Sequence, residues 1–415
     1  MKHEAEAVVI GAGAWGASVA FHLAKAGMRD VLLLDKHDVA SQTSPRAAGL
    51  SGQVRTSELM TRLAVRAVKK IEQFERETGE PLVYYQPGSL KIARTAEHEA
   101  QLRAEVRRGR TLGLDVDFVS RHEAQRLQPF LDANGVRAVT YNPTDVYLEP
   151  AQIPRGYARA AERLGVEVLP KTAVVGIATE AGAVTRVVTE RGEVRTNVVV
   201  DAAGAWARGV AGMAGGTMAI VPTRHQLLIT DPIAGVDASQ PIARVIDANV
   251  YIRPERGGLM LGGYEANPAQ YDMRTQPRDF QIEDLPLDLG VLRALAEAIA
   301  PQFPIFREFT VREHRGGLPT MTPDGEHIVG PMPGVRGFFL ASGCCVGGLS
   351  VAPAIGELLG QWIISGSPPM DLTPLSPARF GPQDDLEDRL RHLCRWQYAH
   401  HYWLDKHLRE PNGRA

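Results

Sequence analysis

Glycines near the N-terminus are the first residues whose spacing points to chemistry. Gly11-Ala12-Gly13-Ala14-Trp15-Gly16 fits the pattern G-x-G-x-x-G. In this pattern the first glycine makes a tight turn, the second lets the backbone approach a pyrophosphate, and the third lets a helix pack on a strand. Asp35 follows Gly16 by roughly 20 residues, where a carboxylate accepts hydrogen bonds from ribose hydroxyls. These residues predict a dinucleotide-binding turn.

Such a turn needs a strand before it and a helix after it. The apolar run 7–10 predicts a short buried strand, and residues 17–26 predict a helix that Gly27 ends. Residues 31–34 predict a second strand that leads directly into Asp35. Strand, helix and strand within about 30 residues form the right-handed crossover of a parallel sheet. This context favours a dinucleotide site over a plain tight turn.

A second glycine turn, Gly343-Cys344-Cys345-Val346-Gly347-Gly348, lies far along the chain. It follows an apolar strand at 337–341 and precedes a helix at 352–364, and the turn sequence 320–325 lies upstream. A long cofactor lying across the sheet could use this late return to hold its far end. On spacing alone, a simple helix-packing turn is an equally good interpretation.

Hydrophobic periodicity and breaker residues predict the other elements. A hairpin at 182–201 runs into another small-residue turn, and the strand-rich stretch 220–265 is expected to form an antiparallel sheet. Proline-rich sequence after Gly366 predicts a linker, which a polar helix near 386–408 follows. Further helices are expected at 57–78, 97–112, 150–164 and 286–300, with a strand at 166–169.

Size and composition limit the class of protein. The 415 residues suffice for more than one structural unit, and 44% hydrophobic with 23% charged residues is an ordinary globular balance. The formal net charge of −2 gives no general attraction to nucleic acid or anionic membranes. Three cysteines are too few for a disulfide framework, the N-terminal residues lead us to expect no secretory signal, and no apolar run is long enough to span a membrane. We therefore expect a cytoplasmic protein.

Several segments together resemble the D-amino-acid-oxidase superfamily of FAD enzymes. Within it, they are most similar to the flavin portion of dimethylglycine and sarcosine dehydrogenases and oxidases. The tail at 390–404 also resembles the stretch that leads into a folate-binding domain in dimethylglycine dehydrogenases; because the sequence ends at Ala415, we expect no folate requirement. The segments that carry the resemblance occur in family order at 8–27, 198–207, 224–233, 250–265 and 321–363.

The resemblance implies FAD bound in an extended form beneath an antiparallel sheet. It assigns the first glycine turn to the pyrophosphate, Asp35 to the ribose and the second glycine turn to the pyrimidine end of the flavin. The residues that it assigns to FAD are Gly11, Gly13, Ala14, Trp15, Gly16, Asp35, Lys36, Arg46, Ala47, Gly49, Leu50, Val174, Ala203, Gly204, Trp206, Gly343, Val346, Gly347, Gly348 and Leu349.

Two departures from relatives concern covalent attachment of the flavin. Arg46 stands where dimethylglycine dehydrogenases have a linking histidine, and Gly317 stands where monomeric sarcosine oxidases have a linking cysteine. A guanidinium stays protonated and cannot attack the flavin, so we expect non-covalent FAD. Arg46 then either stabilises negative charge on the reduced ring or is a solvated loop residue. The stretch 259–263 also lacks the lysine that assists oxygen in monomeric sarcosine oxidases, which favours a dehydrogenase slightly.

His225 and Tyr251 are the candidate catalytic residues, because each opens a predicted strand and matches a substrate-facing position in dimethylglycine oxidases. A histidine near its ordinary pKa of about 6.5 could accept or tune the proton of a substrate ammonium. Arg253 and His314 are the candidate substrate-binding residues. Arg253 suits this role because arginine pairs bidentately with carboxylates. Arg256 is expected to be a surface charge.

The tail histidines do not follow a metal-binding pattern. They lie around a polar helix without cysteine or acidic partners, so we expect them to be solvated and expect no metal. Adjacent Cys344 and Cys345 are interpreted as small packing residues, because neighbouring thiols are badly placed for a relaxed disulfide. The tail histidines in question are His392, His400, His401 and His407.

The overall prediction is an α/β protein with a Rossmann-like FAD-binding domain and a substrate domain built on a mainly antiparallel sheet. The FAD-binding domain is expected from 1–80, 141–214 and 316–365, the substrate domain from 81–140 and 215–315, and a linker with a tail helix over 366–415.

The predicted function is FAD-dependent oxidation of a secondary or tertiary amine, such as an N-methyl amino acid, to an iminium that water hydrolyses. Two alternatives stay open. The substrate could be a D-amino acid, glycine or an opine, or the chain could be a flavin subunit of a heteromeric sarcosine-oxidase-like complex. Either oxygen or an electron-transfer protein would accept the electrons, and a homo-oligomer is compatible with the sequence.

Overall fold

Parallel strands surround the first glycine turn in the computed structural model, which describes residues 2–381 and 386–403. β1 (Ala7–Ile10) pairs in parallel with β2 (Val31–Leu34) on one side and with β13 (Val199–Asp201) on the other. Every residue of these three strands is buried, as in a sheet covered on both faces. The sheet has six strands in the order β21-β22-β13-β1-β2-β9, completed by β9 (Glu167–Leu169), β22 (Phe338–Ser342) and the antiparallel edge strand β21 (Ile328–Pro331).

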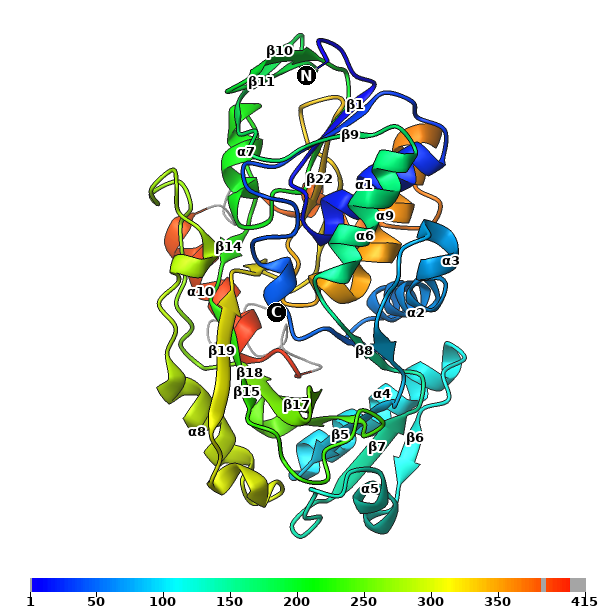
Figure 1. The fold of residues 1–415 in the computed structure, drawn as a ribbon, viewed down its shortest axis with the longest axis vertical. Coiled ribbons are helices and arrows are strands. Elements are labelled where there is room, and N and C mark those ends of the chain that lie inside the picture. The colour runs from blue at the N-terminus through cyan, green and yellow to red at the C-terminus, as the bar shows by residue number, and fades with distance from the viewer. Residues whose placement is uncertain (1, 382–385, 404–415) are drawn as a thin grey trace.

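Three helices from distant parts of the sequence pack together on this sheet (Figure 1). α1 (Ala14–Lys25) lies between α6 (Gln152–Arg163) and α9 (Gly348–Ser365). α1 and α9 approach closely, because a Cβ built on Gly356 would lie 2.1 Å from Ser18 Oγ. Both helices begin three or four residues before their predicted starts, since the last residues of each glycine turn already adopt the helical conformation.

A second, mixed sheet forms the lower half of the molecule in Figure 1. Its neighbours pair antiparallel except for one parallel pair, β5 with β16. The strand-rich stretch 220–265 supplies its centre. The strands in spatial order are β19 (Val311–Gly317), β15 (His225–Thr230), β18 (Gly258–Gly263), β17 (Val250–Glu255), β16 (Ile242–Val245), β5 (Ser89–Ala93), β7 (Ala138–Asn142) and β6 (Asp117–Val119).

Two predicted elements divide in the structure. The predicted helix at 57–78 breaks at Gln73 into α2 (Glu58–Glu72) and α3 (Phe74–Thr78). The predicted hairpin at 182–201 ends earlier, because its last strand leaves to become β13. The hairpin itself belongs to a three-stranded antiparallel sheet of β10 (Val174–Glu180), β11 (Ala183–Thr189) and β12 (Gly192–Arg195).

The remaining strands form two short sheets. In one short sheet, β8 (Val146–Leu148) lies between β3 (Leu50–Ser51) and β4 (Tyr84–Tyr85) and pairs antiparallel with both. A second short sheet pairs β14 (Val221–Pro222) with β20 (Thr320–Met321). The other helices are α4 (Ala96–Thr111), α5 (Arg121–Leu127), α7 (Ala207–Met213) and α8 (Leu289–Ile299).

The segment expected as a free linker is packed against the protein. Leu372 and Leu375 are fully buried in the same apolar core as α1 and α9. α10 (Glu387–Ala399) then packs beside β14 and β20 rather than standing apart. The predicted end of this helix, beyond Trp403, lies outside the described residues.

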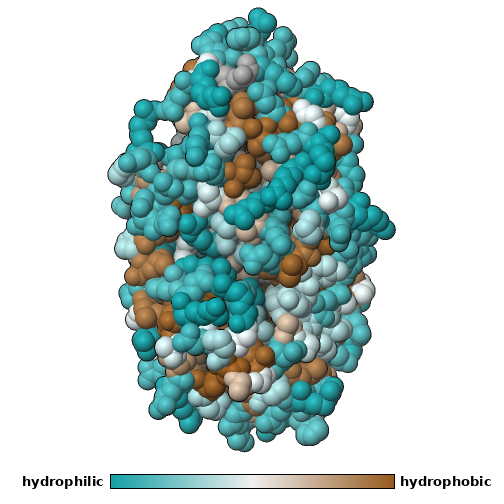
Figure 2. All heavy atoms as spheres, in the orientation of Figure 1, coloured by the Kyte–Doolittle hydropathy of each residue, from teal (hydrophilic) through white to brown (hydrophobic). Residues whose placement is uncertain are grey.

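The face of the molecule in Figure 2 is mainly hydrophilic, with separate apolar patches. Among the residues that the structure describes, no helix is long and apolar enough to cross a bilayer.

Candidate active site

A cavity of about 1000 Å³ connects the two glycine turns with the eight-stranded sheet. This volume is at the upper end of the range for small-molecule and cofactor sites. Of the residues assigned to FAD from the sequence, all except Gly16 and Gly343 line it. The lining also includes both candidate catalytic residues, His225 and Tyr251.

The first glycine turn is shaped by backbone contacts that permit no side chain. Gly11 has a φ of 104°, and a Cβ there would lie 2.4 Å from Ala202 O. A Cβ on Gly16 would lie 1.8 Å from Gly11 O, so Gly16 closes the turn instead of lining the cavity. At Gly13 a Cβ would meet only Ser44 Oγ, at 3.2 Å, and would project into the cavity at the N-terminus of α1. A helix N-terminus with such close backbone access is suited to a pyrophosphate.

Asp35 lies at the end of β2 and lines the cavity. Its Oδ2 accepts a hydrogen bond from Ala12 N and its Oδ1 from His37 N, both at 2.7 Å. Each oxygen keeps acceptor capacity for a ribose hydroxyl. Burial raises the pKa of Asp35 to about 6, which the two backbone donors and Lys36 oppose. Lys36 itself lies over the ring of Trp206, with Nζ 4.8 Å from the ring centre.

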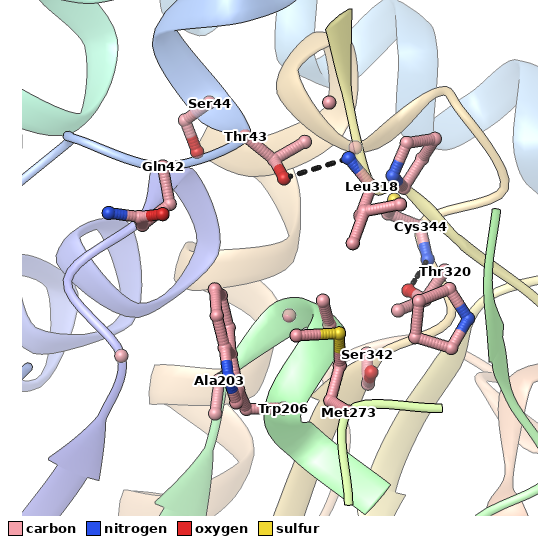
Figure 3. Close-up of a pocket in the computed structure, with 18 of the residues that line it drawn as sticks. Gln42, Thr43, Ser44, Ala203, Trp206, Met273, Leu318, Thr320, Ser342 and Cys344 are labelled. Atoms are coloured by element: carbon pink, nitrogen blue, oxygen red, sulfur yellow. Dashed lines mark hydrogen bonds between the residues drawn. The ribbon is translucent and has the colours of Figure 1, made fainter. Parts of the chain in front are cut away.

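The second glycine turn is held beside the first. Trp15 Nε1 donates a hydrogen bond to Gly348 O at 2.6 Å. Cys345 and Val346 have φ values of 43° and 63°, a left-handed conformation that costs free energy for residues with a Cβ and is frequent at binding sites. Gly343 has a φ of 64° in the same region and does not line the cavity, and a Cβ there would lie 2.6 Å from Thr322 Cγ2. In Figure 3, Thr320 and Cys344 are joined by the bond from Cys344 N to Thr320 Oγ1, 3.1 Å.

Neither position of covalent attachment in relatives carries a nucleophile here. Arg46 belongs to a single turn of helix (Ser44–Arg46), and its Nη1 donates to Ser41 O at 2.5 Å and to Gln42 O at 2.6 Å. The guanidinium therefore braces its own loop. Gly317 lines the cavity next to Leu318, whose N donates to Thr43 Oγ1 at 3.1 Å (Figure 3).

His225 and Tyr251 form a hydrogen-bonded pair in the wall of the same cavity. They come from neighbouring parts of one sheet, and His225 Nε2 lies 2.9 Å from Tyr251 Oη. Burial lowers the pKa of His225 to about 4, so the imidazole is neutral near pH 7. Burial also raises the pKa of the Tyr251 hydroxyl, which therefore stays protonated.

Part of the cavity wall comes from the tail, which the sequence did not indicate. His401 stacks on Tyr264 with ring centres 4.1 Å apart, and Tyr402 lines the cavity beside it. The hydroxyl oxygen of Tyr398 lies 2.8 Å from His225 Nδ1. The expectation that the tail histidines are solvated is therefore wrong for His401. Within the described residues no cluster of His, Cys, Asp and Glu could hold a metal ion, and His407 lies outside them.

The two predicted substrate-binding residues do not reach the cavity. Arg253 is 2% exposed, donates from Nε to Ala48 O at 2.7 Å and pairs with Glu255. His314 is turned to Gln226, with Nε2 3.2 Å from Oε1. These contacts satisfy both side chains within the protein and correct their assignment to the substrate.

Two other arginines, Arg55 and Arg244, do reach the cavity. Both line the cavity, and Arg244 stands opposite Tyr251 in the pairing of β16 with β17. Arg55 Nε and Arg244 Nη1 are buried, and neither has a hydrogen-bond partner among the described residues. Asp145, the nearest acid, already accepts from Gln53 N at 2.8 Å and from Ser89. Two buried guanidiniums with unused donors favour a bound anion.

The two sheets, the paired glycine turns and the cavity between them define a dinucleotide-binding oxidoreductase fold with a separate substrate end. Residues 6–362 match the family described as FAD dependent oxidoreductase, and the chain belongs to that family. It is accordingly an FAD-dependent oxidoreductase, and the cradle for pyrophosphate and ribose described above fits FAD.

Three relatives place the chain more closely. It is 32% identical to mitochondrial dimethylglycine dehydrogenase of Rattus norvegicus over 92% of this chain and 45% of that protein. It is 31% identical to human mitochondrial sarcosine dehydrogenase over 91% of this chain and 41% of that protein. The L-proline dehydrogenase structure from P. horikoshii superposes with a TM-score of 0.83 at 25% identity, covering 92% of this chain and 98% of that one. The chain thus spans less than half the length of the dimethylglycine and sarcosine dehydrogenases that it matches.

Proposed function

We propose that this chain oxidises a secondary or tertiary amine that also carries a carboxylate, such as an N-methyl or N-alkyl amino acid. The observation that carries the proposal is the His225–Tyr251 pair, neutral near pH 7, in the wall of the cavity that the dinucleotide turn also lines. The similarity to dimethylglycine and sarcosine dehydrogenases supports the same substrate class. FAD, when bound, accepts the hydride of such a reaction.

The proposed role of His225 and Tyr251 is to hold the reacting amine in its uncharged form. A nitrogen must have a free lone pair before its neighbouring C–H bond can lose a hydride. A histidine with a pKa of about 4 is too weak a base to store the ammonium proton near pH 7. The pair therefore orients the free amine through the Tyr251 hydroxyl and leaves the proton to solvent before chemistry. This role differs from the expectation drawn from the sequence, which assumed a histidine with a pKa near 6.5.

Arg55 and Arg244 are proposed to hold the substrate carboxylate. Their unused N–H groups are buried at the cavity, and Arg244 is directly across from Tyr251. A carboxylate there would supply the missing acceptors, while the amine end of the same small molecule reaches Tyr251. A charge-assisted pair of this kind gives both affinity and orientation.

The products follow from the substrate class. Loss of hydride from the carbon next to nitrogen leaves an iminium, and addition of water to its C=N bond gives a carbonyl compound and a shortened amine. An N-methyl substrate would yield formaldehyde and the demethylated amine. Water and not an oxidant supplies the oxygen atom.

The deciding experiment measures flavin bleaching without oxygen by the purified, FAD-loaded chain. N,N-dimethylglycine and sarcosine are compared with glycine, a D-amino acid and N,N-dimethylethanolamine, which lacks the carboxylate. We expect fast bleaching and stoichiometric formaldehyde with an N-methyl amino acid only. Preference for glycine or a D-amino acid would replace the substrate assignment, and no bleaching with any compound would favour a partner-dependent flavin subunit.

A further inference from the structure

The hydrogen bonds around His225 involve the tail as well as the sheet. Tyr251 Oη lies 2.9 Å from Nε2, and Tyr398 Oη, near the end of α10, lies 2.8 Å from Nδ1. The imidazole is thus held at both nitrogens by hydroxyls from segments almost 150 residues apart in the sequence.

These two contacts determine where the proton of the neutral imidazole resides. A neutral imidazole has one N–H donor and one acceptor nitrogen, whereas a hydroxyl can donate and accept. Tyr398 is 1% exposed, so its hydroxyl hydrogen needs an acceptor inside the protein. Among the described residues that acceptor is His225 Nδ1. Tyr398 must therefore donate, which leaves the proton on Nε2.

The Nε2 proton in turn orients Tyr251. Nε2–H donates to Tyr251 Oη, so the Tyr251 hydroxyl hydrogen is free to point into the cavity, where Tyr251 is a lining residue. The charged groups that act on Tyr398 are Glu265 and Arg224, and these pair with each other at 3.5 Å. Tyr251 and the ring of Tyr264 complete its surroundings.

Both halves of the protein hold this part of the tail in place. Arg208, in α7, pairs with Glu387 at 2.8 Å at the start of α10. Asn249, beside the eight-stranded sheet, donates from Nδ2 to Ala399 O at 2.9 Å, next to Tyr398. Between these two contacts along α10, Gln270 Nε2 donates to Arg391 O at 2.9 Å.

We propose that Tyr398 is a positioning residue of the active site: it fixes the Nε2–H tautomer of His225 and thereby directs the Tyr251 hydroxyl to the substrate. The tail helix is then part of the catalytic machinery. This inference rests on the proposed role of His225 and Tyr251 in amine oxidation.

The first test reads the tautomer directly and needs no substrate. Nitrogen NMR of FAD-loaded protein with 15N-labelled histidine distinguishes the protonated from the unprotonated ring nitrogen, and the His225→Gln variant assigns the signals. We expect Nε2–H in the unaltered protein and a mixture of tautomers in Tyr398→Phe. A proton on Nδ1 in the unaltered protein, or an unchanged tautomer in Tyr398→Phe, would overturn the inference.

The second test is kinetic. Tyr398→Phe should retain FAD and slow anaerobic flavin reduction by N,N-dimethylglycine about threefold to tenfold, the value of one hydrogen bond, with the substrate Kd unchanged. Tyr141→Phe is the matched control. It removes a hydroxyl that donates to Pro87 O at 2.9 Å, and Tyr141 does not line the cavity. Normal reduction in Tyr398→Phe but slow reduction in His225→Ala would reject this inference alone. Normal reduction in His225→Ala would reject the proposed function of the pair.

Discussion

Trp15 and Gly348 are joined by a hydrogen bond of 2.6 Å although 333 residues separate them in the sequence. The indole N–H of the first glycine turn donates to a carbonyl of the second, at the point where α9 begins. This buried contact adds to the packing of α1 against α9 and helps to fix the two halves of the proposed FAD site relative to each other.

Trp15→Phe should loosen that cradle. It leaves the Gly348 carbonyl without its indole donor, a loss of about 1–3 kcal/mol for a buried group. We expect weaker FAD binding and a lower melting temperature, measured by flavin titration of the apoprotein and by thermal unfolding. Trp362→Phe, a change of the same size outside the cavity, should leave FAD affinity unchanged.

Gly13→Val and Gly16→Ala should separate cofactor binding from folding. At Gly13 the Cβ of the added side chain would meet only Ser44 Oγ, and Gly13 lines the cavity, so the protein should fold but purify without yellow colour. At Gly16 even one Cβ would lie 1.8 Å from Gly11 O, so Gly16→Ala should be poorly folded. Flavin absorbance and circular dichroism of both variants check this. Full flavin content in Gly13→Val would mean that the pyrophosphate lies elsewhere.

The FAD should come away from the denatured protein. Arg46 is engaged with Ser41 O and Gln42 O, and Gly317 has no side chain, so neither attachment position provides a nucleophile. Acid precipitation should leave yellow FAD in the supernatant. Flavin retained in the pellet would contradict this prediction.

Arg244→Met should reveal the carboxylate site. Losing a hydrogen bond to a charged group costs about 1.5–3 kcal/mol, which corresponds to roughly tenfold to 150-fold weaker binding. We expect that increase in the Kd of N,N-dimethylglycine, measured from the concentration dependence of flavin reduction, with little change for N,N-dimethylethanolamine. Equal effects on both amines would show that Arg244 does not contact the carboxylate.

Stability in the absence of FAD should depend on pH through buried histidines. Burial lowers the pKa of His22 to about 3 and that of His327 to about 4. In the unfolded chain these groups titrate near 6.5 and bind protons first, so their contribution to stability is complete above about pH 6.5 and is lost as the pH falls toward 4. The raised pKa of Asp35, about 6, acts in the opposite direction.

Urea unfolding of the apoprotein between pH 4 and pH 7 measures this balance. Asp201 and Glu265, whose pKa values burial also raises, act in the same direction as Asp35. The four histidines outnumber these three carboxyl groups, because His37 and His225 also have pKa values lowered to about 4. We expect the urea concentration at the unfolding midpoint to decrease as the pH is lowered from 7 to 4. The decrease should be smaller in His327→Asn. A midpoint that rises steadily as the pH falls would show that buried carboxyl groups dominate.

The first crossover was predictable because its causes are local. Glycines at fixed spacing, apolar strands and Asp35 specify the turn without reference to distant residues. The position of Arg253 was not predictable in this way. It shares a strand face with Tyr251, as the alternation of β17 requires, yet its guanidinium donates to Ala48 O and pairs with Glu255, and it does not line the cavity. Arg244 faces the cavity because β16 pairs with β17 in one register, which no local pattern specifies.

The contacts of the tail could not be predicted from local sequence patterns either. Its proline-rich start and polar helix are typical of a linker, but Leu372 and Leu375 are buried and Tyr398 reaches His225. Those contacts depend on the surface that the rest of the chain presents. A local sequence pattern can indicate that α10 is a polar helix. Which side of α10 is buried depends on the folded surface against which it packs.

The strand order of the six-stranded sheet has a consequence for synthesis on the ribosome. β1 and β2 emerge early, but β13, the other neighbour of β1, follows only at Val199, and β22 only at Phe338. At about 5–20 residues per second, the open edge of β1 stays without its partner for about ten seconds or more. The nascent chain therefore carries an unpaired apolar edge until most of it has been translated, and FAD cannot be fully enclosed before Leu349 has left the exit tunnel.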